Sequence, residues 1–118
     1  MPNITFIEYP RINALEEEQL PQKPILLDYS DLEVNFPSVT FNINWESYPE
    51  ALGYRLDVSS TSDFKNMFTS YNNLDVGNVL TKNIILSGVY YTYYYRIRAY
   101  TSNFISINSD VGILNIGD

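Results

Sequence analysis

Apolar and polar residues alternate along most of the chain after residue 24. In the clearest run, residues 39–45, four apolar residues are separated by three polar ones: Val39, Phe41, Ile43 and Trp45. Residues 54–58 and 92–101 alternate in the same way. A period of two is typical of a strand with one buried face. These three segments are therefore predicted to be strands.

Shorter apolar segments complete the predicted set of strands. They are residues 25–27 with 32–34, 68–71, 83–86 and 111–116. Turn-forming residues separate the segments, for example Leu52-Gly53, Val76-Gly77-Asn78 and Ser87-Gly88. About seven short strands with regular turns favour an all-β fold, an antiparallel two-sheet sandwich.

The alternation also predicts which side chains form the core. In residues 92–101, Tyr93, Tyr95, Ile97 and Ala99 share one face. The side chains expected to be buried together are those in the inward phase of three strands: Trp45, Tyr54, Leu56, Tyr95 and Ile97.

Two separate motifs in this order resemble the fibronectin type III family. Residues 45–59 (WESYPEALGYRLDVS) resemble its B-strand tryptophan, linker and C-strand tyrosine, and residues 86–99 resemble its E–F turn and F strand. The middle stretch, residues 63–78, is similar to such domains in bacterial surface and phage proteins. The likeness covers roughly residues 25–117 and implies an immunoglobulin-like sandwich.

The resemblance assigns roles to two aromatic residues. Trp45 would fill the core between the sheets, and Tyr93 would be the tyrosine corner, whose hydroxyl bonds the backbone upstream. Seven steps separate Leu86 from Tyr93, one more than the family usually has, which predicts an extra residue around Val89–Tyr91. The chain has no Arg-Gly-Asp, so the integrin-binding feature of some members is not implied.

Residues 1–24 differ in composition and are predicted to form an N-terminal arm. They include four prolines, an extended stretch at Thr5–Tyr9 and a possible short helix at 13–20, which Asn13 can cap. Such a segment is a poor independent structure, but its apolar side chains can be buried against a partner: Ile4, Phe6, Ile7, Ile12 and Leu15. The alternative is that the arm folds back over an edge strand of its own sandwich.

Composition excludes several classes of chemistry. A chain of 118 residues has room for one domain, and the sandwich is expected over residues 25–118. The sequence contains no Cys and no His, so thiolate chemistry, the usual general base and the usual nitrogen ligand are missing. The acids are scattered without ligand spacing, so we expect no catalytic residues, no metal site and no cofactor. A net charge of −7 disfavours nucleic acid and anionic membranes as partners.

The outward stripe of residues 92–101 leaves three interpretations open. It consists of Tyr94, Arg96, Arg98 and Tyr100. In the first, Arg55 and Asp57 pair with Arg96 or Arg98 and the face is simply solvated. In the second, the stripe contacts a protein partner, since Tyr and Arg are enriched in such interfaces. In the third, its aromatic rings stack on sugars.

The predicted function is that of a non-enzymatic structural or interaction protein. The chain begins Met-Pro, has an arm and shows no export signal, and phage virions are a known home of the resembled family. We therefore expect a small phage virion subunit, a capsid decoration or tail-associated protein, bound through its arm to other protein subunits of the assembly. The alternative is an adhesion or glycan-binding module of a secreted bacterial surface protein, acting outside the cell or at its surface.

Overall fold

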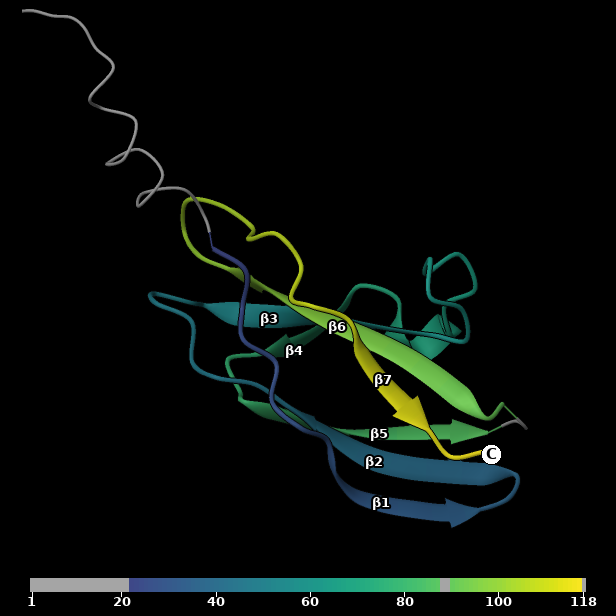
Figure 1. Cartoon of the computed structure of the whole chain (residues 1–118). Helices are drawn as coiled ribbons and strands as arrows, with labels where there is room; N and C mark the ends of the chain where they lie inside the picture. Colours follow the sequence, from purple (N-terminus) through teal and green to yellow (C-terminus); the bar gives the residue numbers. More distant parts are fainter. Residues whose placement is uncertain (1–21, 88–89, 118) are drawn as a thin grey trace, which may run out of the picture.

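Two antiparallel sheets form the domain in the computed structural model, which describes residues 22–87 and 90–117 (Figure 1). The first sheet has the order β1-β2-β5, with bounds β1 Ser30–Asn35, β2 Ser38–Asn44 and β5 Thr81–Ser87. The second has the order β4-β3-β6-β7, with bounds β4 Leu74–Gly77, β3 Gly53–Ser59, β6 Thr92–Tyr100 and β7 Gly112–Asn115. The predicted all-β, two-sheet sandwich is confirmed.

The core lies between the sheets and has the composition expected from the alternation. Trp45 is 1% exposed, and its ring centroid lies 5.5 Å from that of Tyr54. Leu56, Tyr95 and Ile97 are buried as well, so all five predicted core residues are confirmed. The residues of β6 alternate strictly between buried and half-buried, which fixes the strand's register between β3 and β7.

One local prediction in the middle of the chain is wrong, and a second is only partly right. Residues 68–71 do not form a strand: Thr69–Tyr71 is a 3₁₀ helix (η2), in which the Tyr71 amide donates to the Phe68 carbonyl. The expected turn at Val76-Gly77-Asn78 instead overlaps strand β4. Gly77 adopts φ +79°, and its backbone amide donates to the Asp75 carboxylate. The glycine therefore has a turn conformation, but it is also the last residue of the strand.

The first predicted edge segment is interrupted. Residues 25–27 form only an isolated bridge, Leu26 to Trp45, before β1 begins at Ser30. Asp31 has φ 56°, a left-handed backbone, and the β1–β2 register shifts beside it. The chain therefore follows the edge of β2 in two pieces.

Tyr93 is buried as the resemblance implied, but its hydroxyl makes no hydrogen bond to a described residue. Burial raises the pKa of this hydroxyl. The nearby Tyr90 backbone opposes that rise without reaching hydrogen-bonding geometry. Gly88 and Val89, where the extra turn residue is predicted, lie outside the described residues. The corner hydrogen bond therefore stays a prediction.

Candidate functional site

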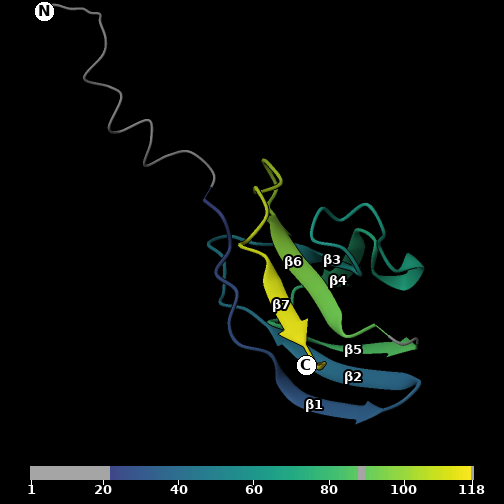
Figure 2. The same cartoon turned by 45° about the vertical axis from the view of Figure 1, so that its right-hand side comes forward.

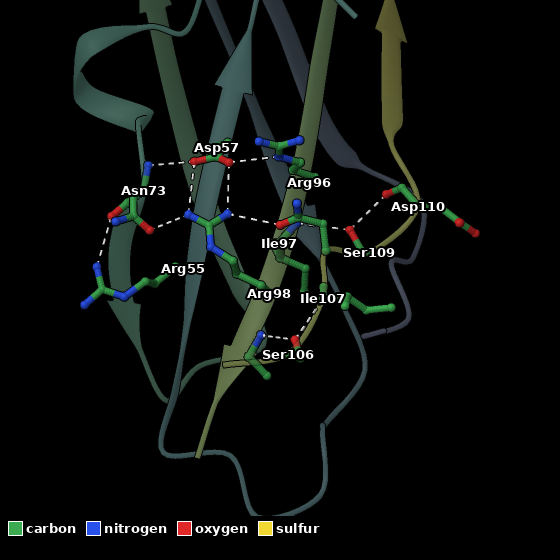
Figure 3. A network of polar contacts seen from close by, with 12 residues as sticks. Arg55, Asp57, Asn73, Arg96, Ile97, Arg98, Ser106, Ile107, Ser109 and Asp110 are labelled. Atoms are coloured by element: carbon green, nitrogen blue, oxygen red, sulfur yellow. Dashed lines mark hydrogen bonds and ion pairs between the residues drawn. The ribbon is translucent and has the colours of Figure 1, made fainter. Parts of the chain in front are cut away.

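A buried carboxylate organises the outer face of the four-stranded sheet (Figure 3). Asp57, on β3, is 1% exposed and lies opposite Arg96 in the β3–β6 register. Arg96 Nε and Arg98 Nη1 each donate to Asp57 Oδ2 at 2.9 Å. The backbone N–H of Asn73 donates to the other carboxylate oxygen, Oδ1, at 2.6 Å. Both arginines of the predicted stripe are therefore bound to a single carboxylate.

The pKa of Asp57 reflects two opposing effects. Burial raises the pKa of this carboxyl, because an ion loses hydration in the protein. The hydrogen bonds from Arg98, Arg96 and the Asn73 amide favour the ionised form and outweigh burial, so the pKa lies below its ordinary value. Asp57 is ionised at neutral pH and acts as a fixed counter-ion.

An aromatic ring from the loop after β3 packs against one arginine of this ion cluster. The Phe64 side chain is buried, and the Arg96 guanidinium lies 4.0 Å from the centroid of its ring. Contact between a cation and an aromatic face is favourable, particularly when water is excluded. The expected pairing of Asp57 with Arg96 or Arg98 is confirmed, with both arginines engaged. The interpretation of this part of the face as simply solvated is wrong for Asp57, which is buried and bound by Arg96, Arg98 and the backbone amide of Asn73.

The two tyrosines of the stripe have different surroundings. Tyr100, at the end of β6, donates its hydroxyl to Asp75 Oδ1 at 2.9 Å, and the Arg55 guanidinium lies 5.6 Å from its ring centroid. Tyr94 is half-buried, in register with Ser59 on β3 and Ile113 on β7. The sheet places Tyr94, Arg96, Arg98 and Tyr100 on one face as predicted. Their role in binding a partner stays a prediction.

Two serines, which sequence reasoning did not single out, position the loop between β6 and β7. Ser106 Oγ accepts from the Ala99 amide at 2.9 Å, and Ser109 Oγ accepts from the Ile97 amide at 3.0 Å. Both serines are buried, and they provide partners for β6 before β7 begins (Figure 3). The flanking Ile107 is left exposed on the loop. The spacing of small polar residues within an apolar stretch is the signal that could have identified them.

Residues 25–36 and 104–113 border one side of the sandwich, which we call the open side (Figure 2). Most of the exposed large apolar side chains of the described residues belong to these two segments. A groove of about 250 Å³ separates the two segments, and Leu27, Tyr29, Val111 and Ile113 are among the residues that line it. Tyr95 also reaches this groove, and burial raises its pKa to about 12. A partly apolar groove beside the free edge of β7 is suited to binding another protein segment.

The expected arm residues lie outside the described part of the chain. Ile4, Phe6, Ile7, Ile12 and Leu15, and the predicted helix at 13–20, all precede residue 22. The last residues of the expected arm do contact the sandwich. The Gln22 amide donates to the Tyr48 hydroxyl at 3.2 Å, Lys23 pairs with Asp110 at 2.7 Å, and Pro24 is buried. Residues 22–24 thus contact the sandwich at one end of the open side.

The described residues contain no cluster of three or more acidic, histidine or cysteine side chains that could hold a metal ion. Within the same ranges, no helix has the length and apolar character needed to cross a membrane.

Solved structures that resemble this chain include fibronectin type III domains. An Fn3-like protein from Clostridium thermocellum is 23% identical with a TM-score of 0.52, covering 83% of this chain and 95% of that one. The sixth fibronectin type III domain from human fibronectin type III domain containing protein 3 is 18% identical with a TM-score of 0.56, covering 84% and 86%. A domain derived from the human KIAA0970 protein is 16% identical with a TM-score of 0.55, covering 97% and 89%.

At these identities the likeness concerns the fold, so this chain has a fibronectin type III-like fold. No protein-family model matches the chain, and no curated protein matches it.

Proposed function

We propose that this chain is a non-enzymatic interaction subunit of a larger assembly, specifically a small phage virion protein that decorates the capsid or associates with the tail. Residues 1–24 attach it to neighbouring protein subunits, and the sandwich is the displayed module. In this proposal its location is the virion, and it needs no cofactor.

The main support is the open side. Its exposed side chains are large and apolar; Ile113, for example, is 56% exposed. A single exposed apolar residue is ordinary, whereas a row of them beside a groove is typical of a contact surface. The arm sequence adds a second apolar set, including Phe6 and Ile7, immediately upstream of this side.

The polar face supports a binding function over catalysis. Arg96, Arg98 and Asp57 are bound to one another, and Tyr100 is bound to Asp75. Groups tied into structural ion pairs and hydrogen bonds are poorly placed to transfer protons to a substrate. As a contact surface, the stripe offers tyrosine rings and arginine stems already held in place.

The test is co-sedimentation with virions purified from the cell that produces the chain, quantified by mass spectrometry. We compare the full chain, a chain starting at Gln22, and a Phe6→Asp/Ile7→Asp variant, with Ile85→Asp as a control on exposed β5. The full chain and the control are expected in the particles. The amount of the truncated chain and of the Phe6→Asp/Ile7→Asp variant in the particles should be about tenfold lower, which corresponds to a loss of about 1.4 kcal/mol of binding free energy. A full chain missing from virions, or a truncated chain at full occupancy, contradicts the proposal.

The alternative, glycan binding by a surface module, is tested on a glycan array. Specific binding that Tyr94→Ala and Tyr100→Ala abolish, together with absence from virions, would replace the virion proposal.

A further inference from the structure

Two strand edges on the open side lack a neighbour among the described strands. β1 pairs with β2 alone, and β7 pairs with β6 alone. An unpaired edge presents free backbone donors and acceptors, which a further strand can use. Figure 2 shows β7 above β2 and β1, and the groove described above runs between residues 26–29 and 110–113. The open side can therefore accept an extended segment.

On the opposite side of the sandwich, a tyrosine side chain blocks part of the free edge of β5. The Tyr71 hydroxyl accepts from the Ile85 amide at 2.9 Å and donates to the Ile85 carbonyl at 3.3 Å. Ile85 is on β5, the outer strand of its sheet. The Tyr71 hydroxyl therefore occupies the Ile85 amide and carbonyl, which an added strand would need. Strand addition is thus favoured at the open side.

The exposed apolar residues of the open side belong to two faces. On β1, Val34 is in register with the buried Val39, so it points toward the space between the sheets. On β7, Ile113 is in register with Tyr94, so it points to the outer face. A strand added along β7 needs apolar side chains on both of its own faces to cover both sets.

Residues 3–9, with the sequence NITFIEY, have this property. Ile4 and Phe6 share one face of an extended segment, and Ile7 and Tyr9 share the other. The segment contains one charge, Glu8, and no proline. It matches an edge strand that is covered on both faces, which is an unusual pattern for a solvated tail.

The chain between this segment and the sandwich is long enough to allow its return. Residues 10–21 connect it to Gln22 and can extend about 40 Å at roughly 3.3 Å per residue. The Lys23–Asp110 ion pair fixes the end of this connection next to Val111, at the mouth of the groove. A segment tethered so close has an effective concentration of about millimolar, which favours its own groove over that of a second copy.

We propose that, in the isolated protein, residues 3–9 add as a strand along β7 and fill the groove of the same chain. This proposal is independent of the proposed function, because it concerns a protein with no partner. In an assembly, the same apolar residues would leave the groove to bind a neighbouring subunit, and the open side would become exposed.

Cross-linking within the full chain tests this, and the chain has no cysteine of its own. The test variant is Thr5→Cys/Ile113→Cys, which retains the apolar residues of the segment. The control is Thr5→Cys/Ile85→Cys, since Ile85 is 62% exposed on the opposite edge. Both double-cysteine variants are cross-linked with a short bismaleimide at low protein concentration. Mass spectrometry then separates intramolecular from intermolecular products.

We expect the groove pair to link intramolecularly about tenfold faster than the control pair. Adding Ile4→Asp and Phe6→Asp should remove the difference. Equal rates for the two pairs, a rate that the aspartates leave unchanged, or a product that is only intermolecular would each overturn the proposal.

Hydrogen exchange provides a second measurement that needs no cysteine. In the full chain, backbone amides of residues 112–115 should exchange about tenfold more slowly than in a chain starting at Gln22. Amides of β4, a second edge strand remote from the groove, should be unaffected. Identical exchange of β7 in the two chains contradicts the proposal.

Discussion

Replacing Asp57 by Asn tests how far the ion cluster stabilises the sandwich. The substitution keeps the size of the side chain but leaves Arg96 and Arg98 without their shared carboxylate. Removing one partner of a buried ion pair typically costs about 3–5 kcal/mol. The side chains of Arg96 and Arg98 remain 26% and 17% exposed, so water can hydrate them partly. We therefore expect the lower end, about 3 kcal/mol of unfolding free energy.

Urea denaturation followed by the fluorescence of Trp45, the single tryptophan, measures this loss at neutral pH. A loss of 3 kcal/mol corresponds to a melting temperature lower by roughly 10 °C or more. The control is Asp110→Asn, which breaks the Lys23 pair. The side chains of that pair are 53% and 80% exposed, so the effect should stay under about 1 kcal/mol. A change of less than about 1 kcal/mol for Asp57→Asn would refute the reasoning.

The pH dependence gives an independent check on the same residue. Because the pKa of Asp57 is lower in the folded protein than its ordinary value of 3.8, its stabilising contribution is fully present above about pH 4. This contribution is lost as the pH falls through the folded-state pKa. The stability difference between the native protein and Asp57→Asn should be constant from about pH 5 to pH 8 and shrink below about pH 4. A difference that persists unchanged in acid would show that the charge is not responsible.

Four further predictions follow from contacts in the core and at its edges. Trp45→Ala removes the central core side chain and should cost about 3–5 kcal/mol in denaturation followed by circular dichroism. Gly112→Ala places a Cβ 2.2 Å from the Tyr95 ring and should cost about 1–3 kcal/mol in the same assay; a neutral result would mean that the ring moves aside freely. Tyr71→Phe removes both hydrogen bonds to Ile85 and should cost about 1–3 kcal/mol, with unchanged stability as the contrary outcome. Millimolar calcium should leave the melting temperature unchanged, and a rise of several degrees would contradict the expectation that the protein has no metal site.

The sequence by itself determined the class of fold and the core. Period-two alternation assigns each side chain of residues 39–45 and 92–100 to one face, and burial of one face is the dominant stabilising effect. The inward positions of Trp45, Tyr54 and Ile97 followed directly from that pattern. The alternation is a local property of the chain, so it can be determined without knowing which strands pair.

Only the tertiary structure decided what the polar residues do. Asp57 occupies an outward position by alternation, yet it is buried and bound by Arg96, Arg98 and Asn73 from elsewhere in the chain. Residues 68–71 are apolar enough for a strand, but Tyr71 instead places its hydroxyl on the β5 edge from a 3₁₀ turn. These outcomes depend on contacts between segments distant in sequence, and no local pattern encodes which loop covers which face. The groove of the open side likewise exists only because residues 26–29 and 110–113, from opposite ends of the described chain, lie on either side of it.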